Sequence, residues 1–140
     1  ISSSYRAYAV DFDKDGQRDL WQSIPDVTGS VANYFRRHGW QTGKPIAERI
    51  EPRDSNLDGL VAKKLKPNLT TTQLSDAGIA LKGIAEGKKS LHRLLGDSGD
   101  EYWVAHKNFY VITRYNHSKL YAMAVFQLSE LIESAFQSAQ

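Results

Sequence analysis

Apolar residues recur at helical spacing near both ends of the chain. Positions three and four apart along residues 118–135 predict the clearest helix, because such residues share one face of a helix. The residues expected on its buried side are Leu120, Met123, Ala124, Gln127, Leu128, Leu131 and Ala135. The same spacing predicts a helix over residues 27–38, followed by Gly39 where a terminating glycine is common. Its apolar residues that share one face are Val27, Val31, Tyr34 and Phe35.

The middle of the chain is interrupted by proline and glycine, which favours short elements there. Extended pieces are predicted at residues 47–50, 60–65, 91–95 and 102–106. The last two pieces are separated by a turn-rich Gly-Asp-Ser-Gly-Asp segment and read as a pair of strands. A short helix is predicted over residues 71–77, whereas the aromatic and β-branched residues 108–115 are compatible with strand or helix. We therefore expect an α+β fold that is mainly helical.

Composition narrows the classes of protein. The chain has 140 residues, which suits one domain or part of a larger one. Its 41% hydrophobic and 24% charged residues are typical of globular proteins and argue against long disorder. The absence of cysteine excludes disulfides and thiol nucleophiles. A net charge of +2 is too small to indicate a nucleic-acid partner.

An acidic segment carries the strongest chemical signal. Asp11, Asp13 and Asp15 alternate ahead of Gly16 in the pattern D-x-D-x-D-G, which opens a calcium loop. Alternate carboxylates converge on one point as the chain curls, the glycine permits the sharp turn, and Gln17 then offers its backbone carbonyl. Three close carboxylates would repel one another strongly without a cation.

The second half of this loop departs from a standard EF-hand. The twelfth position is Gln22, where a bidentate glutamate is expected. Asp26 can supply the last carboxylate of the calcium site if residues 20–25 bulge outward, and Asp19 is the alternative residue for this position. The alternative is a solvated acidic turn without a metal, which the pattern disfavours. A repeated calcium loop of the β-propeller type is disfavoured, because the motif occurs once and a predicted helix follows it.

A second informative stretch covers residues 108–121. It is dense in aromatic, amide and hydroxyl side chains just before the long helix, a mixture typical of carbohydrate sites. The alternative is that Phe109, Tyr110 and Tyr115 pack in the core while Asn116 caps the helix. No glutamate or histidine falls in a recognisable catalytic or metal motif. The chain by itself therefore names no catalytic centre.

Three motifs in order resemble the membrane-bound lytic murein transglycosylase B family. They are SSYRAYAVDFD at residues 3–13, GSVANYF with HGW within 29–40, and NFYVITRYNHS with YAMAV within 108–125. The resemblance runs from about residue 3 to residue 128 and is weakest between residues 44 and 100. It implies part of a lysozyme-like core, an EF-hand-like calcium loop and a small β-containing subdomain.

The resemblance also implies an activity. The family cleaves the β-1,4 bond between N-acetylmuramic acid and N-acetylglucosamine in peptidoglycan and leaves a 1,6-anhydro product. One glutamate serves as acid and then base, and the intramolecular 6-hydroxyl replaces the second carboxylate of ordinary glycosidases. That glutamate precedes the calcium loop in the family. We therefore expect no catalytic residue in this chain and no activity of the chain alone.

Site residues follow from matching positions in the family motifs. The resemblance implies substrate binding by Tyr34, Tyr115, Asn116 and Tyr121. It implies structural Ca²⁺ on Asp11, Asp13, Asp15, the Gln17 carbonyl and Asp26. The expected organisation is a calcium loop and core helix over residues 1–42, a β-containing subdomain over 43–107, and a cleft segment and final helix over 108–140.

Partners and location are implied in the same way. The expected partners are peptidoglycan glycan strands and an amino-terminal part of the same protein, with no nucleic acid and a monomeric state. The expected location is the bacterial periplasm or envelope, with possible anchoring to the outer membrane through the amino terminus. Two alternatives remain: a non-catalytic, calcium-stabilised peptidoglycan-binding module, and a structural fragment that folds only with its amino-terminal half.

Overall fold

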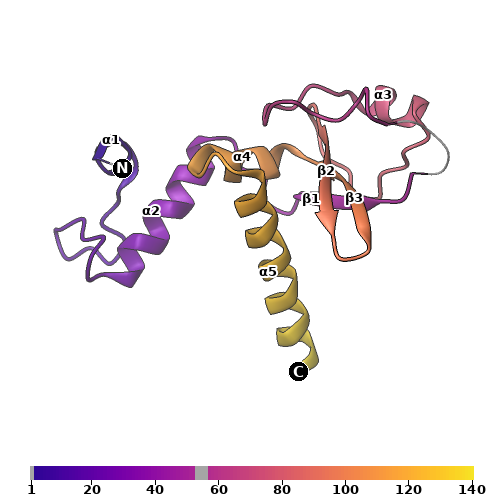
Figure 1. Ribbon diagram of the computed structural model, residues 1–140. Coiled ribbons are helices and arrows are strands. Elements are labelled where there is room, and N and C mark those ends of the chain that lie inside the picture. Colours follow the sequence, from indigo (N-terminus) through magenta and orange to yellow (C-terminus); the bar gives the residue numbers. More distant parts are fainter. Residues whose placement is uncertain (1, 53–56) are drawn as a thin grey trace. The chain divides into compact units, whose positions relative to one another are not determined.

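The computed structural model describes residues 2–52 and 57–140, which form two compact units (Figure 1). Residues 1–40 make the first unit and residues 41–140 the second. The first unit contains α1 (Ser2–Tyr8) and α2 (Ile24–Arg37). The second contains β1 (Ala47–Ile50), α3 (Thr71–Asp76), β2 (Ser90–Gly96), β3 (Gly99–Ala105), α4 (Lys107–Tyr115) and α5 (Lys119–Ser138). Within the described residues this is a mainly helical α+β fold, as predicted.

Aromatic rings hold the first unit together. The rings of Tyr8 and Tyr34 meet edge to face with centroids 4.7 Å apart, and Tyr34 stacks on His38 at 3.9 Å. The Asn33 side chain donates to the Tyr8 carbonyl at 3.0 Å, so α1 is bonded to α2. Of the residues predicted to share one face of this helix, Tyr34 is buried, whereas 40% of Val27 is exposed in the first turn of α2.

A three-stranded antiparallel sheet with the order β1-β3-β2 organises the second unit. The predicted strand at Ala47–Ile50 is confirmed as β1. The two later strands are also confirmed, and they extend to a tight turn in which Gly96 pairs with Gly99. The piece predicted at residues 60–65 is not a strand, since only Val61 makes an isolated bridge, to Leu91. The core on this sheet includes Leu57, Leu69, Leu74, Leu91 and Val104.

The predicted helix at residues 71–77 is confirmed as α3, a single short helix with a clear start. Thr70 accepts the N–H of Gln73, and the Gln73 side chain accepts the N–H of Thr70 in return. This reciprocal pair satisfies two backbone donors that a helix start would otherwise leave open. The capping residue Thr70 therefore sets the point at which α3 begins.

Residues 108–115 form a helix, α4, with a buried face of Phe109, Ile112 and Thr113. The long final helix is confirmed as α5, which Ser118 caps by accepting the N–H of Tyr121 at 3.2 Å. Over the described residues, no helix has both the length and the apolar character needed to span a membrane.

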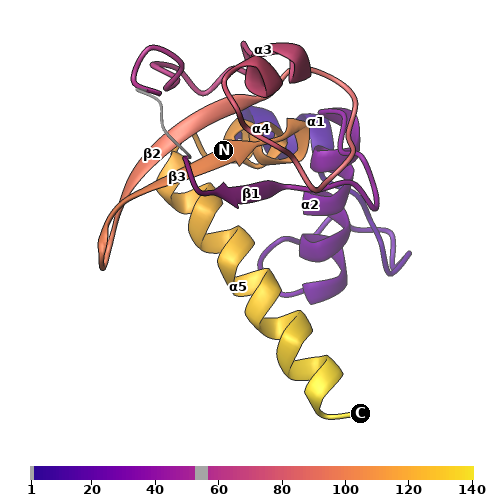
Figure 2. The same cartoon turned by 90° about the vertical axis from the view of Figure 1, so that its right-hand side faces the viewer.

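The buried face predicted for α5 is largely wrong. Its buried residues are Ala122, Met123 and Phe126, and the Phe126 ring meets Trp103 of β3 edge to face at 6.1 Å. The leucines expected inside are exposed: Leu120, Leu128 and Leu131 by 66%, 57% and 68%. Only the first half of α5 has the sheet beside it, and the second half projects beyond the strands of its unit (Figure 2).

Candidate functional site

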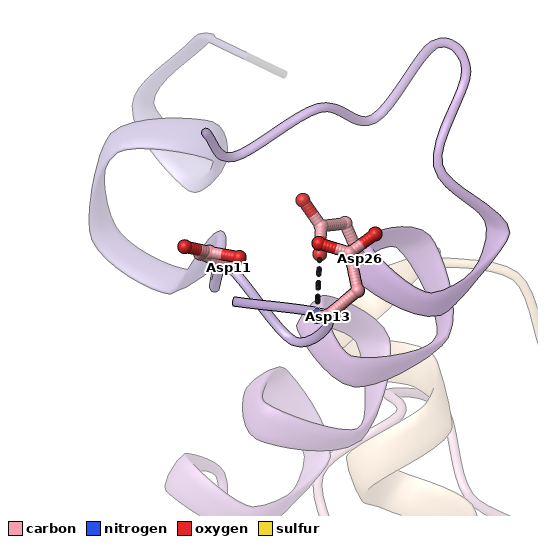
Figure 3. Close-up of side chains that lie close together, drawn as sticks. All are labelled: Asp11, Asp13 and Asp26. Carbon is pink, nitrogen blue, oxygen red and sulfur yellow. Dashed lines mark hydrogen bonds between the residues drawn. The ribbon is translucent and has the colours of Figure 1, made fainter. Parts of the chain in front are cut away.

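The acidic loop between α1 and α2 is organised around one buried carboxylate, that of Asp26 (Figure 3). Asp26 lies in the first turn of α2, and Ser23 caps this turn by accepting the Asp26 N–H. Its Oδ1 accepts the N–H of Phe12 at 2.7 Å and of Asp13 at 3.4 Å. Its Oδ2 accepts the N–H of Asp19 at 2.8 Å. One side chain of the helix therefore holds both ends of the loop.

These bonds keep Asp26 ionised. Burial by itself raises the pKa of a carboxyl, because it disfavours the charged form. Backbone N–H donors from residues 19, 12 and 13 outweigh burial here, so the pKa of Asp26 lies below its ordinary value. A buried carboxylate that stays charged is available as a metal ligand at neutral pH.

Asp11, Asp13 and Asp26 converge in the first unit (Figure 3). Each offers a carboxylate oxygen, and these three oxygens lie within 4.8 Å of one another. No lysine or arginine among the described residues forms an ion pair with any of them. Three carboxylates at this spacing without a counter-charge suit a hard cation with oxygen ligands, such as Ca²⁺.

The remaining loop residues are placed differently. Asp15 does not belong to the converging group, and its Oδ1 accepts the N–H of Gln17 at 2.8 Å. Asp19 does not belong to it either, since its Oδ1 accepts the N–H of Trp21 at 2.8 Å in a local turn. Gly16 has a φ of +92°, the left-handed conformation that the pattern requires of a glycine. Of the two carboxylates considered for closing the loop, the structure groups Asp26 with the others.

The four implied substrate-binding residues fall in both units. Tyr34 is buried against His38 in the first unit. The other three are exposed in the second unit, at the corner where α4 ends and α5 begins: Tyr115, Asn116 and Tyr121. Half of Tyr115 and 40% of Tyr121 are exposed, so neither is a core residue. The cap of α5 is Ser118, so the alternative in which Asn116 caps this helix is wrong.

A buried polar cluster in the second unit carries no sequence signal. Glu48 of β1 meets His106 with its Oε2 2.6 Å from Nε2, across 58 positions of the chain. Its Oε1 accepts the N–H groups of Lys82 at 2.7 Å and Gly83 at 3.1 Å. Burial raises the pKa of Glu48, but the bonds from His106 and the two N–H groups outweigh burial and lower it. A general acid in a glycosidase needs the opposite shift, so this arrangement does not suit Glu48 for that role.

Comparison with known proteins defines the family. The chain belongs to the transglycosylase SLT domain family, whose family model matches residues 1–130. Membrane-bound lytic murein transglycosylase B of Escherichia coli K12 is 42% identical over 137 residues, which cover 96% of this chain and 37% of that protein. The family predicted from the three motifs is confirmed.

Solved structures agree with this assignment. The soluble lytic transglycosylase SltB1 of Pseudomonas aeruginosa has a TM-score of 0.87 at 43% identity, over 96% of this chain and 45% of that chain. The Escherichia coli lytic transglycosylase Slt35 in complex with calcium has a TM-score of 0.82 at 41% identity, over 96% and 42%. The predicted lysozyme-like α+β fold class is confirmed. The chain thus spans less than half the length of these relatives.

Proposed function

We propose that this chain is part of a lytic murein transglycosylase that cleaves the β-1,4 bond between N-acetylmuramic acid and N-acetylglucosamine in peptidoglycan. The observation that carries the proposal is the family match over residues 1–130, which includes both the acidic loop and the α4–α5 corner. The expected partners are glycan strands, with the remainder of the same protein completing the enzyme. The expected setting is the bacterial envelope, and the expected state is a monomer.

The proposed chemistry needs one glutamate in two protonation states. The protonated carboxyl donates its proton to the leaving glycosidic oxygen as the C1–O4 bond breaks. The muramic 6-hydroxyl attacks C1 and gives its proton to the same carboxylate, which restores the acid and closes the 1,6-anhydro ring. Glu48 is held ionised, and Glu101 forms an ion pair with Arg49 at 3.4 Å. Neither of these two glutamates suits the role of the acid. Following the family resemblance, we assign the acid to the protein beyond these 140 residues.

The exposed groups at the α4–α5 corner suit the binding of a glycan. The phenol rings of Tyr115 and Tyr121 offer faces for sugar rings and hydroxyls for hydrogen bonds. The Asn116 amide offers a donor and an acceptor to an N-acetyl group. We assign these three residues to substrate binding and retain Tyr34 of the first unit as a fourth candidate. We also propose that the chain divides into a calcium loop and core helix over residues 1–42, a β-containing subdomain over 43–107, and a cleft segment and final helix over 108–140.

We propose that the acidic loop holds a structural Ca²⁺ on Asp11, Asp13 and Asp26, with Asp15 and the Gln17 carbonyl completing the ligand set. The calcium complex of Slt35 supports this assignment. The fit rests on this chain's own donors. They are three converging carboxylates that have no ion-pair partner in the part of the chain that the structure describes, and the buried one of them is kept charged. The ion would neutralise their repulsion and fix the start of α2. It has no part in bond cleavage.

The test compares the protein encoded by the complete gene with the 140-residue chain. Each is incubated with purified peptidoglycan sacculi, and the products are identified by mass spectrometry. We expect 1,6-anhydro muropeptides from the complete protein and none from the chain alone. Hydrolysed muropeptides without the anhydro ring, or no products from the complete protein, would refute the proposed reaction. Binding of sacculi by a complete protein without cleavage would instead identify a calcium-stabilised binding module.

A further inference from the structure

The segment between α3 and β2, residues 77–88, contains no helix or strand but is held in shape by two side chains of opposite charge. Glu48 accepts the backbone N–H groups of Lys82 and Gly83 in the middle of the segment, as described above. The Lys89 ammonium donates to the carbonyls of Ala85 and Gly87, both at 2.9 Å. Because one side chain satisfies donors and the other acceptors, the segment has a defined backbone without regular structure.

This segment and α3 line a pocket of about 290 Å³. Its apolar wall includes Ile79, Ala80 and Leu81, and Ser75 adds a hydroxyl from α3. Lys89 lies in the same wall. The volume is at the lower end of the range for small-molecule sites, which is roughly 300–1,000 Å³. The pocket therefore suits a ligand with a small apolar part and one polar group.

Lys89 is the unusual member of this wall. Only 2% of the residue is exposed, whereas lysine is almost never buried unless it is paired. Within the described residues, no aspartate or glutamate forms an ion pair with it, and its nitrogen has two hydrogen-bond acceptors for three donors. Burial lowers the pKa of Lys89, and the charge of Glu48 opposes this only in part. An anion in the pocket would supply the missing counter-charge.

We propose that this pocket binds the carboxyl terminus of a peptide that ends in a small apolar residue. The carboxylate accepts the remaining N–H of the Lys89 ammonium, and the side chain lies against Ile79, Ala80 and Leu81. A charge-assisted hydrogen bond to a buried ammonium favours a carboxylate over an amide. The site lies in the sheet-bearing unit and involves no sugar, so it is independent of the glycan cleavage proposed above.

The test is an NMR titration of the ¹⁵N-labelled 140-residue chain with N-acetyl-alanyl-alanine, and separately with its carboxamide. We expect saturable shifts of backbone amides within residues 79–89 for the acid, and at least tenfold weaker binding for the carboxamide. Equal binding of the two probes, or shifts confined to other residues, would overturn the proposal. Absence of shifts up to the solubility limit of the acid would also overturn it.

Two variants separate binding from folding. Lys89→Met removes the ammonium that the carboxylate contacts. It also removes two hydrogen bonds to the segment, so the spectrum of this variant must first show a folded chain. Ala80→Trp leaves Lys89 in place and fills the pocket from an exposed position of its wall. We expect Ala80→Trp to abolish the shifts, while the matched control Ala124→Trp, at an exposed position of α5, retains them. Wild-type binding by Ala80→Trp would show that the probe does not enter this pocket.

Discussion

A buried histidine should make the stability of the second unit depend on pH. His92 of β2 is 2% exposed, and its Nε2 lies 2.9 Å from the Ser90 hydroxyl. Its Nδ1 is buried without a hydrogen-bond partner among the described residues. A second proton there would be a buried donor with no acceptor. Burial, with a smaller effect from the charge of Lys119, lowers the pKa of His92 from 6.5 to about 4.

The sign and size follow from proton linkage. A lowered pKa in the folded state means that the unfolded chain binds the proton first as the pH falls. The stabilisation is therefore complete above pH 6.5 and is lost as the pH falls through about 4. Between pH 7 and pH 4.5, titration of His92 should remove about 2 kcal/mol from the free energy of unfolding.

The assay is urea unfolding at both pH values, followed by the NMR intensities of β3 amides, which report on this unit alone. His92→Gln removes the titration and can still bond the Ser90 hydroxyl, so it should lose about 2 kcal/mol less than the wild type between the two pH values. The control Val104→Ala removes buried apolar volume without a titrating group and should keep the wild-type pH dependence. An equal loss in the wild type and His92→Gln would refute the argument.

Three further outcomes are expected. Calcium should raise the melting temperature of the wild type, by the equivalent of about 1.4 kcal/mol at ten times Kd. Asp13→Ala should abolish that shift and Asp97→Ala retain it; persistence in Asp13→Ala means that Asp13 is not a ligand. In the complete enzyme, Tyr115→Phe should lower kcat/KM by roughly 5- to 150-fold at unchanged melting temperature if its hydroxyl bonds substrate. Normal turnover with a lower melting temperature would make Tyr115 structural. Glu48→Ala should reduce the free energy of unfolding by about 3 kcal/mol in urea, because His106 and two N–H groups lose their acceptor. A loss as small as that of exposed Glu51→Ala would contradict this.

Local signals in the sequence predicted the elements well. Residues close in sequence give the signal for the strand Ala47–Ile50, for the short helix after Thr70 and for the two strands around the glycine turn. Residues 108–115 were ambiguous because aromatic and β-branched residues suit both strands and buried helices. The structure shows that these residues form a helix, in which Phe109, Ile112 and Thr113 are buried at helical spacing.

The errors arise where neighbours distant in sequence decide the outcome. The spacing of Leu120, Leu128 and Leu131 indicates an apolar helix face, but a face is buried only where another element covers it. The bond between Glu48 and His106 joins residues 58 positions apart, and neither occurs in a motif. The acidic loop was predictable because its pattern is local, whereas the choice between Asp19 and Asp26 depended on how residues 20–25 fold.

The Asp26 carboxylate also determines how the acidic loop can open. The N–H groups of residues 12, 13 and 19 all donate to it, although they lie on both arms of the loop. Each of the three is protected from exchange with solvent while its bond to that carboxylate is intact. Release of Asp26 from the first turn of α2 frees all three together. We therefore expect the two arms of the loop and the start of the helix to open in hydrogen exchange as one cooperative unit, although they are separate elements in the fold.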